Sequence, residues 1–172
     1  MHISDGILSP GVLAAGFAIS VGGTWLGLKK LDYEKVPSAA AVCAGFFVAS
    51  LIHFPIGPAN FHLVLNGLAG IILGWTVFPV ILVALSLQFL FFNYGGILCL
   101  PVNTANMALP AILSYYIFRK FIILQGRRKN FRTALAAFFC GAFAIFASAL
   151  MTSSSLFLSD PFYANAARIF FI

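Results

Sequence analysis

Residues 133–158 read TALAAFFCGAFAIFASALMTSSSLFL, a run of apolar and small residues without any charged side chain. A helix needs about 20 consecutive apolar residues to cross the hydrocarbon core of a bilayer, and this run is longer than that. The whole chain has the same character: of its 172 residues, 62% are hydrophobic and 8% are charged, whereas soluble domains carry roughly 25% charged residues. The composition predicts an integral membrane protein.

Five other apolar runs precede this one, at about residues 10–28, 36–54, 62–73, 77–92 and 103–118. The third and fourth hold no charged residue and are together too long for one span, so we expect two helices with a hinge near Gly74. The sequence therefore predicts an all-α membrane protein, a compact bundle of about six transmembrane helices plus a short or truncated seventh. Residues 1–172 form a single transmembrane domain.

The positive charges predict the orientation of this bundle. Every lysine and arginine except Arg168 lies in one of two connections, residues 29–35 and 119–132. Positively charged connections face the cytoplasm, so we interpret the net charge of +6 as an orientation signal and expect no nucleic acid as a partner. The amino terminus then lies outside, together with residues 53–62 and 93–106. All three histidines share this outer side.

The amino-terminal segment, residues 1–9, begins Met1-His2-Ile3-Ser4-Asp5-Gly6. The Met1 α-amine, the His2 backbone nitrogen and one His2 imidazole nitrogen can hold one metal ion in two fused rings. A flat nitrogen-rich donor set suits Ni(II), Cu(II) or Co(II), and His62 can supply a fourth nitrogen. The alternatives are a disordered terminus and, for His62, an interfacial histidine bonded to water. No basic residue precedes the first apolar run, so we expect no cleaved signal peptide.

Other residue types narrow the function further. Asp5 is the acidic residue nearest to these donors and could orient an imidazole or cap the first helix. Cys43, Cys99 and Cys140 have no C-x-x-C spacing, so we interpret them as small packing residues. The chain has no H-E-x-x-H, G-x-S-x-G or P-loop motif. We therefore expect no catalysis, and an ATP-driven transporter would need ATPases from other chains.

Residues 1–10, MHISDGILSP, resemble the amino-terminal signature of the NikM/CbiM family, the substrate-binding membrane subunits of energy-coupling-factor transporters for nickel and cobalt. Phe61-His62-Leu63 is similar to the family's Gly-His-Leu, and Gly95-Gly96, followed after six residues by Asn-x-x-Asn-Met, matches its later pattern. The resemblance covers residues 1–107 by motif and extends to about residue 158 by the arrangement of spans. It implies capture of Ni(II) or Co(II) at the outer face as transported substrate, without an organic cofactor.

The resemblance also implies residue roles. The metal ligands are expected to be Met1, His2 and His62. Amides of the later pattern can hold the amino-terminal loop from beneath, although Asn103 could equally be a helix N-cap. His53 stands where the family usually has Asn before Phe-Pro-Ile, and could be an extra ligand or a group bonded to a liganding imidazole. The candidate supporting residues are Asp5, His53, Asn60, Asn93, Asn103 and Asn106.

Two stripes of small residues lie on the first two apolar runs. Such stripes let helices approach closely, either inside one bundle or between subunits, and these resemble the faces through which binding subunits meet the coupling subunit. The resemblance implies as partners, besides membrane lipid, a transmembrane coupling subunit, a cytoplasmic ATPase pair and often a small extra membrane subunit, in a bacterial or archaeal cytoplasmic membrane. The stripes are Ala14, Ala18, Gly22 and Ala41, Gly45, Ala49.

The carboxy-terminal segment, residues 159–172, departs from the family, whose members usually continue through a full final helix. The residues after Pro161 would rise only about 16 Å as a helix, roughly half of the hydrocarbon core. We therefore expect either that residues 162–172 lie along the outer interface or that the chain is shortened from a longer one.

Two other functional hypotheses compete with metal capture. A structural or assembly membrane protein that binds no metal explains the hydrophobicity equally well, but not why a chelating terminus and His62 share one face. A membrane metalloenzyme is less favoured, because a square of four protein nitrogens leaves no in-plane position for substrate, whereas catalytic metal sites keep one open.

Overall fold

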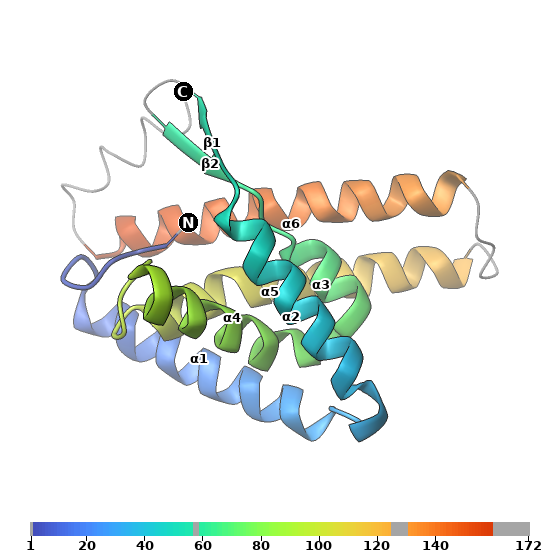
Figure 1. Ribbon diagram of the computed structural model, residues 1–172, viewed down its shortest axis with the longest axis horizontal. Helices are drawn as coiled ribbons and strands as arrows, with labels where there is room; N and C mark the ends of the chain where they lie inside the picture. Colours follow the sequence, from blue (N-terminus) through green and yellow to red (C-terminus); the bar gives the residue numbers. More distant parts are fainter. Residues whose placement is uncertain (1, 57–58, 125–130, 160–172) are drawn as a thin grey trace.

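A computed structural model of the chain describes residues 2–56, 59–124 and 131–159, and of the side chains of residues 53–62 and 123–124 nothing is described. The described part is a helical bundle with one short hairpin (Figure 1). Four stretches, residues 10–29, 33–51, 66–92 and 131–157, are long and apolar enough to cross a membrane. The elements are α1 (Pro10–Lys29), the 3-10 helix η1 (Tyr33–Lys35), α2 (Val36–Leu51), β1 (His53–Ile56), β2 (Ala59–His62), α3 (Asn66–Leu73), the 3-10 helix η2 (Gly74–Thr76), α4 (Val77–Phe92), α5 (Leu100–Leu124) and α6 (Phe131–Phe157).

The bundle is centred on α5, which packs against α1, α3, α4 and α6. Its first half is buried and carries several polar side chains, among them Asn103, Thr104 and Asn106. A buried polar group needs a hydrogen-bond partner, and the surrounding helices supply them. The polar helix of this membrane protein is therefore the innermost one. The predicted start at residue 103 was too late, because Pro101 is tolerated in the first turn of a helix.

Close contacts hold α3 against α5 and α6 at the centre of the bundle. A Cβ at Gly70 would overlap the carbonyl of Ala111 on α5, and one at Gly67 would come within 2.8 Å of the Gly141 backbone on α6. The fully buried Asn66 donates to the Met107 carbonyl at 3.2 Å and to Ser148 Oγ at 2.7 Å. One amide at the start of α3 thus joins three helices.

The hinge predicted near Gly74 is confirmed. α3 ends at Leu73, η2 turns the chain, and α4 continues from Val77. Gly74 has φ +57°, a conformation that glycine adopts without steric cost. A Cβ there would also lie 3.3 Å from the ring of Tyr115.

The helices predicted to reach residue 54 and to begin at residue 62 are wrong at those ends. α2 ends at Leu51, and the chain then forms a two-stranded antiparallel hairpin in which His53 pairs with His62. Pro55 explains the difference, because proline lacks the backbone N–H that a continuing helix requires. The all-α prediction therefore holds for the bundle but missed this hairpin. Of the predicted carboxy-terminal segment, residues 159–172, all but Ser159 lies outside the described residues.

The two faces of α1 differ. Its buried face holds Gly16, Ser20, Gly23 and Gly27, and a Cβ at Gly23 would come within about 2.5 Å of the Phe78 ring. The predicted stripe Ala14, Ala18, Gly22 is exposed, as are Ala41 and Gly45 on α2, whereas Ala49 is buried. Among the described residues, the stripe on α1 therefore does not pack inside the bundle, contrary to that alternative.

The bundle has two chemically distinct ends. Figure 1 shows the amino-terminal segment, the end of α4, the start of α5 and the end of α6 at one end, which we name the amino-terminal end. The other end, which we name the basic end, carries η1, η2 and the basic residues Lys30, Lys35 and Arg119 around a common pocket. The outside orientation of the amino-terminal end remains a prediction.

Candidate functional site

At the amino-terminal end, one amide holds the backbone of the first residues. Ile3 N–H donates to Asn103 Oδ1 at 3.1 Å, and Asn103 Nδ2 donates back to the Ile3 carbonyl at 3.0 Å. Ile3 and Asn103 are both buried, so each bond replaces water that cannot reach the group. The N-cap alternative for Asn103 is wrong, because α5 begins at Leu100. The residue after His2 is thereby fixed to the central helix.

Asp5 ties the same segment to the turn before α5. Its Oδ1 accepts from the N–H groups of Leu98 and Cys99, both at 3.0 Å. A Cβ at Gly96 would overlap this carboxylate, so only glycine lets the two segments approach so closely. The N-cap of α1 is Ser9, so the prediction that Asp5 caps α1 is wrong. Asp5 instead accepts from two backbone N–H groups in the turn that leads into α5.

Cys99 completes this contact as a neutral thiol. Its S–H donates to the Ser4 carbonyl at 3.2 Å. Burial is the main cause, and the charge of Asp5 the second, that raises the pKa of the Cys99 thiol to about 11. Metals bind the thiolate and not the thiol, so at neutral pH Cys99 acts as a donor to the backbone. Its burial agrees with the packing role expected from the sequence.

His2 is held through its imidazole. Its Nε2 lies 2.8 Å from Oε1 of Gln88, a fully buried residue near the end of α4. The Gln88 Nε2 donates to Ser50 Oγ, and the Ser50 hydroxyl donates in turn to the Phe47 carbonyl at 2.7 Å. Because the Ser50 proton is directed to Phe47, its oxygen accepts from the Gln88 amide. The carbonyl oxygen of Gln88 is therefore the end that faces His2.

This chain of bonds selects the tautomer of the imidazole. An amide oxygen only accepts hydrogen bonds, so Nε2 of His2 carries the proton and the lone pair is on Nδ1. Nδ1 is the ring nitrogen closer to the backbone, the one that can close a six-membered ring with the His2 backbone nitrogen around a metal. The ring of Tyr94 lies 6.0 Å away, centroid to centroid. Gly95, with φ +79°, turns the chain beside His2.

The other asparagines predicted to support the site lie on different elements. Asn93 has φ +55° and ends α4 in the left-handed conformation, which brings Tyr94 next to His2. Asn106 faces α6, where its Nδ2 donates to Ser155 Oγ at 3.2 Å. Asn106 therefore joins two helices, and among the described residues no hydrogen bond links its side chain to the amino-terminal segment. Asn60 lies on β2.

The other proposed ligands lie at the edge of the described structure. His53 and His62 are opposite each other at the base of the hairpin, which the Leu63 N–H closes by donating to the Ile52 carbonyl at 3.3 Å. Their side chains, and the whole of Met1, lie outside the described residues. Within the part of the chain that the structure describes, no group of three or more His, Cys, Asp and Glu side chains could hold a metal.

Gln88 and Ser50 were missed by the sequence reasoning. One signal could have found Gln88: it is an amide in the otherwise apolar run of residues 77–92. Polar side chains in membrane spans are costly and are functional candidates for that reason. Ser50 gave no such signal, because serine is common in membrane helices.

Comparison with known proteins identifies relatives of this chain. Residues 2–172 match the family CbiM, described as "Cobalt uptake substrate-specific transmembrane region". The chain is 48% identical over 119 residues to a putative metal transport protein of Haemophilus influenzae, a match that covers 69% of this chain and 58% of the relative. It is 34% identical over 177 residues to the fused nickel transport protein NikMN of Rhodobacter capsulatus, covering 97% of this chain and 50% of the relative.

A solved structure shares the fold. The crystal structure of a truncated transition metal transporter superposes with a TM-score of 0.74 at 30% identity, and the match covers 91% of this chain and 74% of the other. The chain spans about half the length of the first two curated relatives, 58% and 50%. The family expected from the amino-terminal motif is thereby confirmed: this membrane protein belongs to the CbiM family.

Proposed function

We propose that this chain is the substrate-capture membrane subunit of an ATP-driven energy-coupling-factor importer for Ni(II) or Co(II). The ion binds at the amino-terminal end through the Met1 α-amine, the backbone and Nδ1 nitrogens of His2, and His62. The observation that carries this proposal is the bond of 2.8 Å between His2 Nε2 and the buried Gln88. It orients the imidazole before any ion arrives, as the partners of liganding histidines do.

Pre-orientation matters because a terminal chelate is otherwise a flexible one. Fixing the backbone of one residue costs about 1–2 kcal/mol, and a free terminus would bear that cost on binding. Here Asn103 and Asp5 already order the segment that follows His2. The folding of the bundle thus supplies part of the order that metal binding requires.

The hairpin supports His62 as the fourth ligand. Ser50 bonds to Gln88, which bonds to His2, and β1 begins shortly after Ser50. The backbone from Ser50 to His53 spans at most about 11 Å, and His62 pairs with His53. Both histidines therefore belong to a segment that starts beside the chelate, and His53 is the candidate partner of the His62 imidazole.

The donor set suits both metals. Nitrogen ligands bind Ni(II) and Co(II), and selectivity between them rests on geometry. The names of the relatives point the same way, since they include the nickel transport protein NikMN of Rhodobacter capsulatus and the cobalt transport protein CbiM of Geobacter sulfurreducens. We expect no organic cofactor and no catalytic step on this chain.

The remaining parts of the proposal concern assembly. The basic end faces the cytoplasm, following the positive-inside rule, and the amino-terminal end faces outward in a bacterial or archaeal cytoplasmic membrane. The exposed stripe Ala14, Ala18, Gly22 and the exposed Ala41 and Gly45 are the candidate contacts with a transmembrane coupling subunit. A cytoplasmic ATPase pair and a small extra membrane subunit complete the transporter.

Equilibrium dialysis of the purified chain against Ni(II) and Co(II) tests the proposal. The wild type is expected to bind either ion, His2→Ala to bind neither, and His62→Ala to bind more weakly while remaining folded. His53→Asn is the matched control in the same hairpin, with a loss of about 10- to 100-fold. A wild type that binds no metal would favour the structural or assembly protein, and equal binding by the wild type and His2→Ala would contradict the site.

A further inference from the structure

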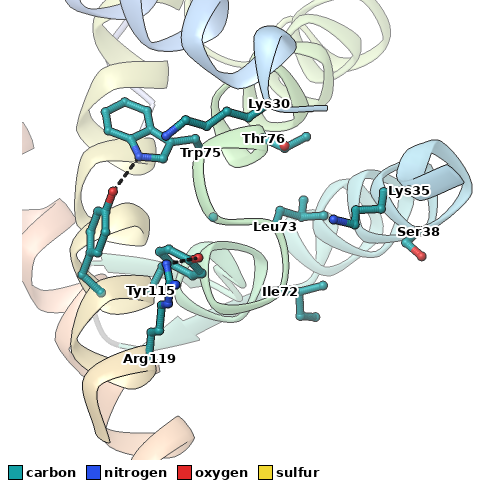
Figure 2. Close-up of a pocket in the computed structure, with 11 residues that line it drawn as sticks. Lys30, Lys35, Ser38, Ile72, Leu73, Trp75, Thr76, Tyr115 and Arg119 are labelled. Atoms are coloured by element: carbon teal, nitrogen blue, oxygen red, sulfur yellow. Dashed lines mark hydrogen bonds between the residues drawn. The ribbon is translucent and has the colours of Figure 1, made fainter. Parts of the chain in front are cut away.

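The basic end carries a pocket of about 420 Å³ between η1, η2 and α5. Figure 2 shows that Lys30, Lys35, Trp75, Tyr115 and Arg119 surround it. The turn at Gly74 forms one wall, because α3 ends there and η2 redirects the chain. The same hinge that separates α3 from α4 therefore opens a cavity at the end of the bundle opposite to the amino-terminal segment.

Three cations from three parts of the chain line this pocket. Lys30 directly follows α1, Lys35 ends η1, and Arg119 lies on α5. Two of them contact aromatic groups: Lys30 Nζ lies 5.0 Å from the centroid of the Trp75 ring, and Arg119 Nη1 donates to the Tyr115 hydroxyl at 3.3 Å. In the described part of the chain no carboxylate is bonded to any of the three. The pocket is therefore lined by three cations and by none of the acidic residues, although Asp32 and Glu34 lie in the same connection as Lys30 and Lys35.

The aromatic residues are fixed in place. Trp75 Nε1 donates to the Tyr116 hydroxyl at 2.8 Å, which joins η2 to α5. Trp and Tyr concentrate at the boundary between the hydrocarbon core and the polar headgroups. Two residues with exposed apolar surface, Ile72 and Tyr116, border the same pocket at 54% and 48% exposure. The site thus has a positive interior and an apolar edge.

We propose that this pocket binds the headgroup of an anionic phospholipid. Its phosphate lies among Lys30, Lys35 and Arg119, with Ser38 as a hydroxyl donor, and its acyl chains leave past Ile72. Basic pockets between membrane helices recognise such headgroups. The exposed apolar edge favours a lipid over a free phosphate ion, which has no apolar part to place there. The inference stands on the pocket alone and does not depend on the metal site.

One series of ligands, followed by two measurements, tests this proposal on the full chain in neutral detergent. The thermal midpoint is measured with phosphatidylglycerol, with phosphatidylcholine and with inorganic phosphate, and native mass spectrometry records which lipid remains bound. Phosphatidylglycerol is expected to raise the midpoint and to remain bound, whereas the other two do neither. This series needs no variant, so a folding failure cannot obscure it.

Variants then locate the site. Lys30→Gln, Lys35→Gln and Arg119→Gln are each expected to weaken phosphatidylglycerol binding about fivefold, since each cation near an anionic lipid contributes a similar increment. Lys29→Gln and Lys120→Gln are the matched controls, because they are neighbours in sequence that do not line the pocket. They should bind as the wild type does.

Several outcomes would overturn the proposal. Equal losses in the pocket variants and the controls would show attraction to general surface charge. Stabilisation by inorganic phosphate as strong as that by phosphatidylglycerol would show a free-anion site. Stabilisation by a soluble Glu-rich peptide but not by phosphatidylglycerol would assign the pocket to an acidic protein segment.

Discussion

Polar groups at the two ends of the bundle have different kinds of partner. At the amino-terminal end, buried amides and a carboxylate are paired with the backbone of residues 3–5 and with the imidazole of His2. At the basic end, exposed cations lie beside aromatic rings without a bonded carboxylate in the described residues. The first arrangement fixes one geometry, as a small ion requires, whereas the second leaves charge for a ligand that supplies its own counter-charge.

The largest effect is expected from Gly96→Ala at the amino-terminal end. The added Cβ overlaps the Asp5 carboxylate and comes within 2.6 Å of its backbone nitrogen, and two N–H bonds prevent that carboxylate from moving aside. We expect a loss of about 1–3 kcal/mol in the free energy of unfolding and a loss of metal affinity on the order of a hundredfold. Thermal melts and metal dialysis measure the two.

The control for this change is Gly11→Ala, since a Cβ at Gly11 has nothing within 4 Å. It should leave metal affinity unchanged and should not lower the free energy of unfolding, because alanine favours a helix more than glycine does. If Gly96→Ala bound metal as tightly as Gly11→Ala does, the contact between Asp5 and the turn before α5 would have no part in the site.

A somewhat smaller effect on metal affinity is expected from Asn103→Leu. It leaves the buried N–H and carbonyl of Ile3 without partners, and each unsatisfied group costs about 1–3 kcal/mol. Metal affinity should fall by some tens of times, within the range seen for groups that support ligands. Asn106→Ala, which loses only the bond to Ser155, should lower stability without changing metal affinity. Equal metal affinities in the two variants would show that Asn103 serves only folding.

The third prediction concerns the imidazole. Gln88→Leu removes the acceptor that keeps the proton on His2 Nε2, so metal affinity should fall about tenfold. Gln88→Glu keeps an acceptor oxygen at the same place and should lose less near neutral pH. Because a carboxylate also favours the protonated imidazole, affinity in Gln88→Glu should fall more steeply as the pH is lowered. Dialysis over a pH series would show this, and equal affinities for the Leu and Glu variants would contradict it.

The smallest effect is expected when a substitution at one end of the bundle is tested by the binding measurement for the other end. Lys30→Gln at the basic end should change metal affinity by no more than about twofold, because distant sites without shared partners behave additively. Gln88→Leu should likewise leave phosphatidylglycerol binding unchanged. A tenfold change in either crossed measurement would show that the two ends are coupled.

Much of the bundle could be predicted from the sequence, because apolar runs fix helix positions. The starts of α1 and α2 and the hinge at Gly74 follow directly from run length and glycine chemistry. The hairpin could not be predicted from hydropathy, because residues 53–62 mix two histidines, an asparagine and two prolines with apolar residues, a composition that fits a connection between helices as well as a strand pair. Residues 56–61 were interpreted as a turn-rich connection between two helices rather than as part of a hairpin.

The site was predictable in part for a different reason. The chelating order of Met1 and His2 is local, so it can be seen in the sequence, but the partners of Asp5, Asn103 and His2 lie far along the chain. Asp5 was expected at an imidazole or at the start of α1, and it bonds to the turn before α5 instead. Only the folded chain shows that Gln88 orients His2, because the two residues lie 86 positions apart in the sequence.

The central claim is that the free α-amine of Met1 and His2 form one chelate on a support built by the bundle. The most direct test compares Ni(II) bound per chain before and after a four-residue Gly-Ser-Gly-Ser extension ahead of Met1, with the same extension at the carboxyl end as control. A single added residue is avoided, because imidazole at the third position forms a nitrogen chelate of its own. We predict that the amino-terminal extension abolishes binding and the carboxy-terminal one does not. Unchanged binding after the amino-terminal extension would contradict the account.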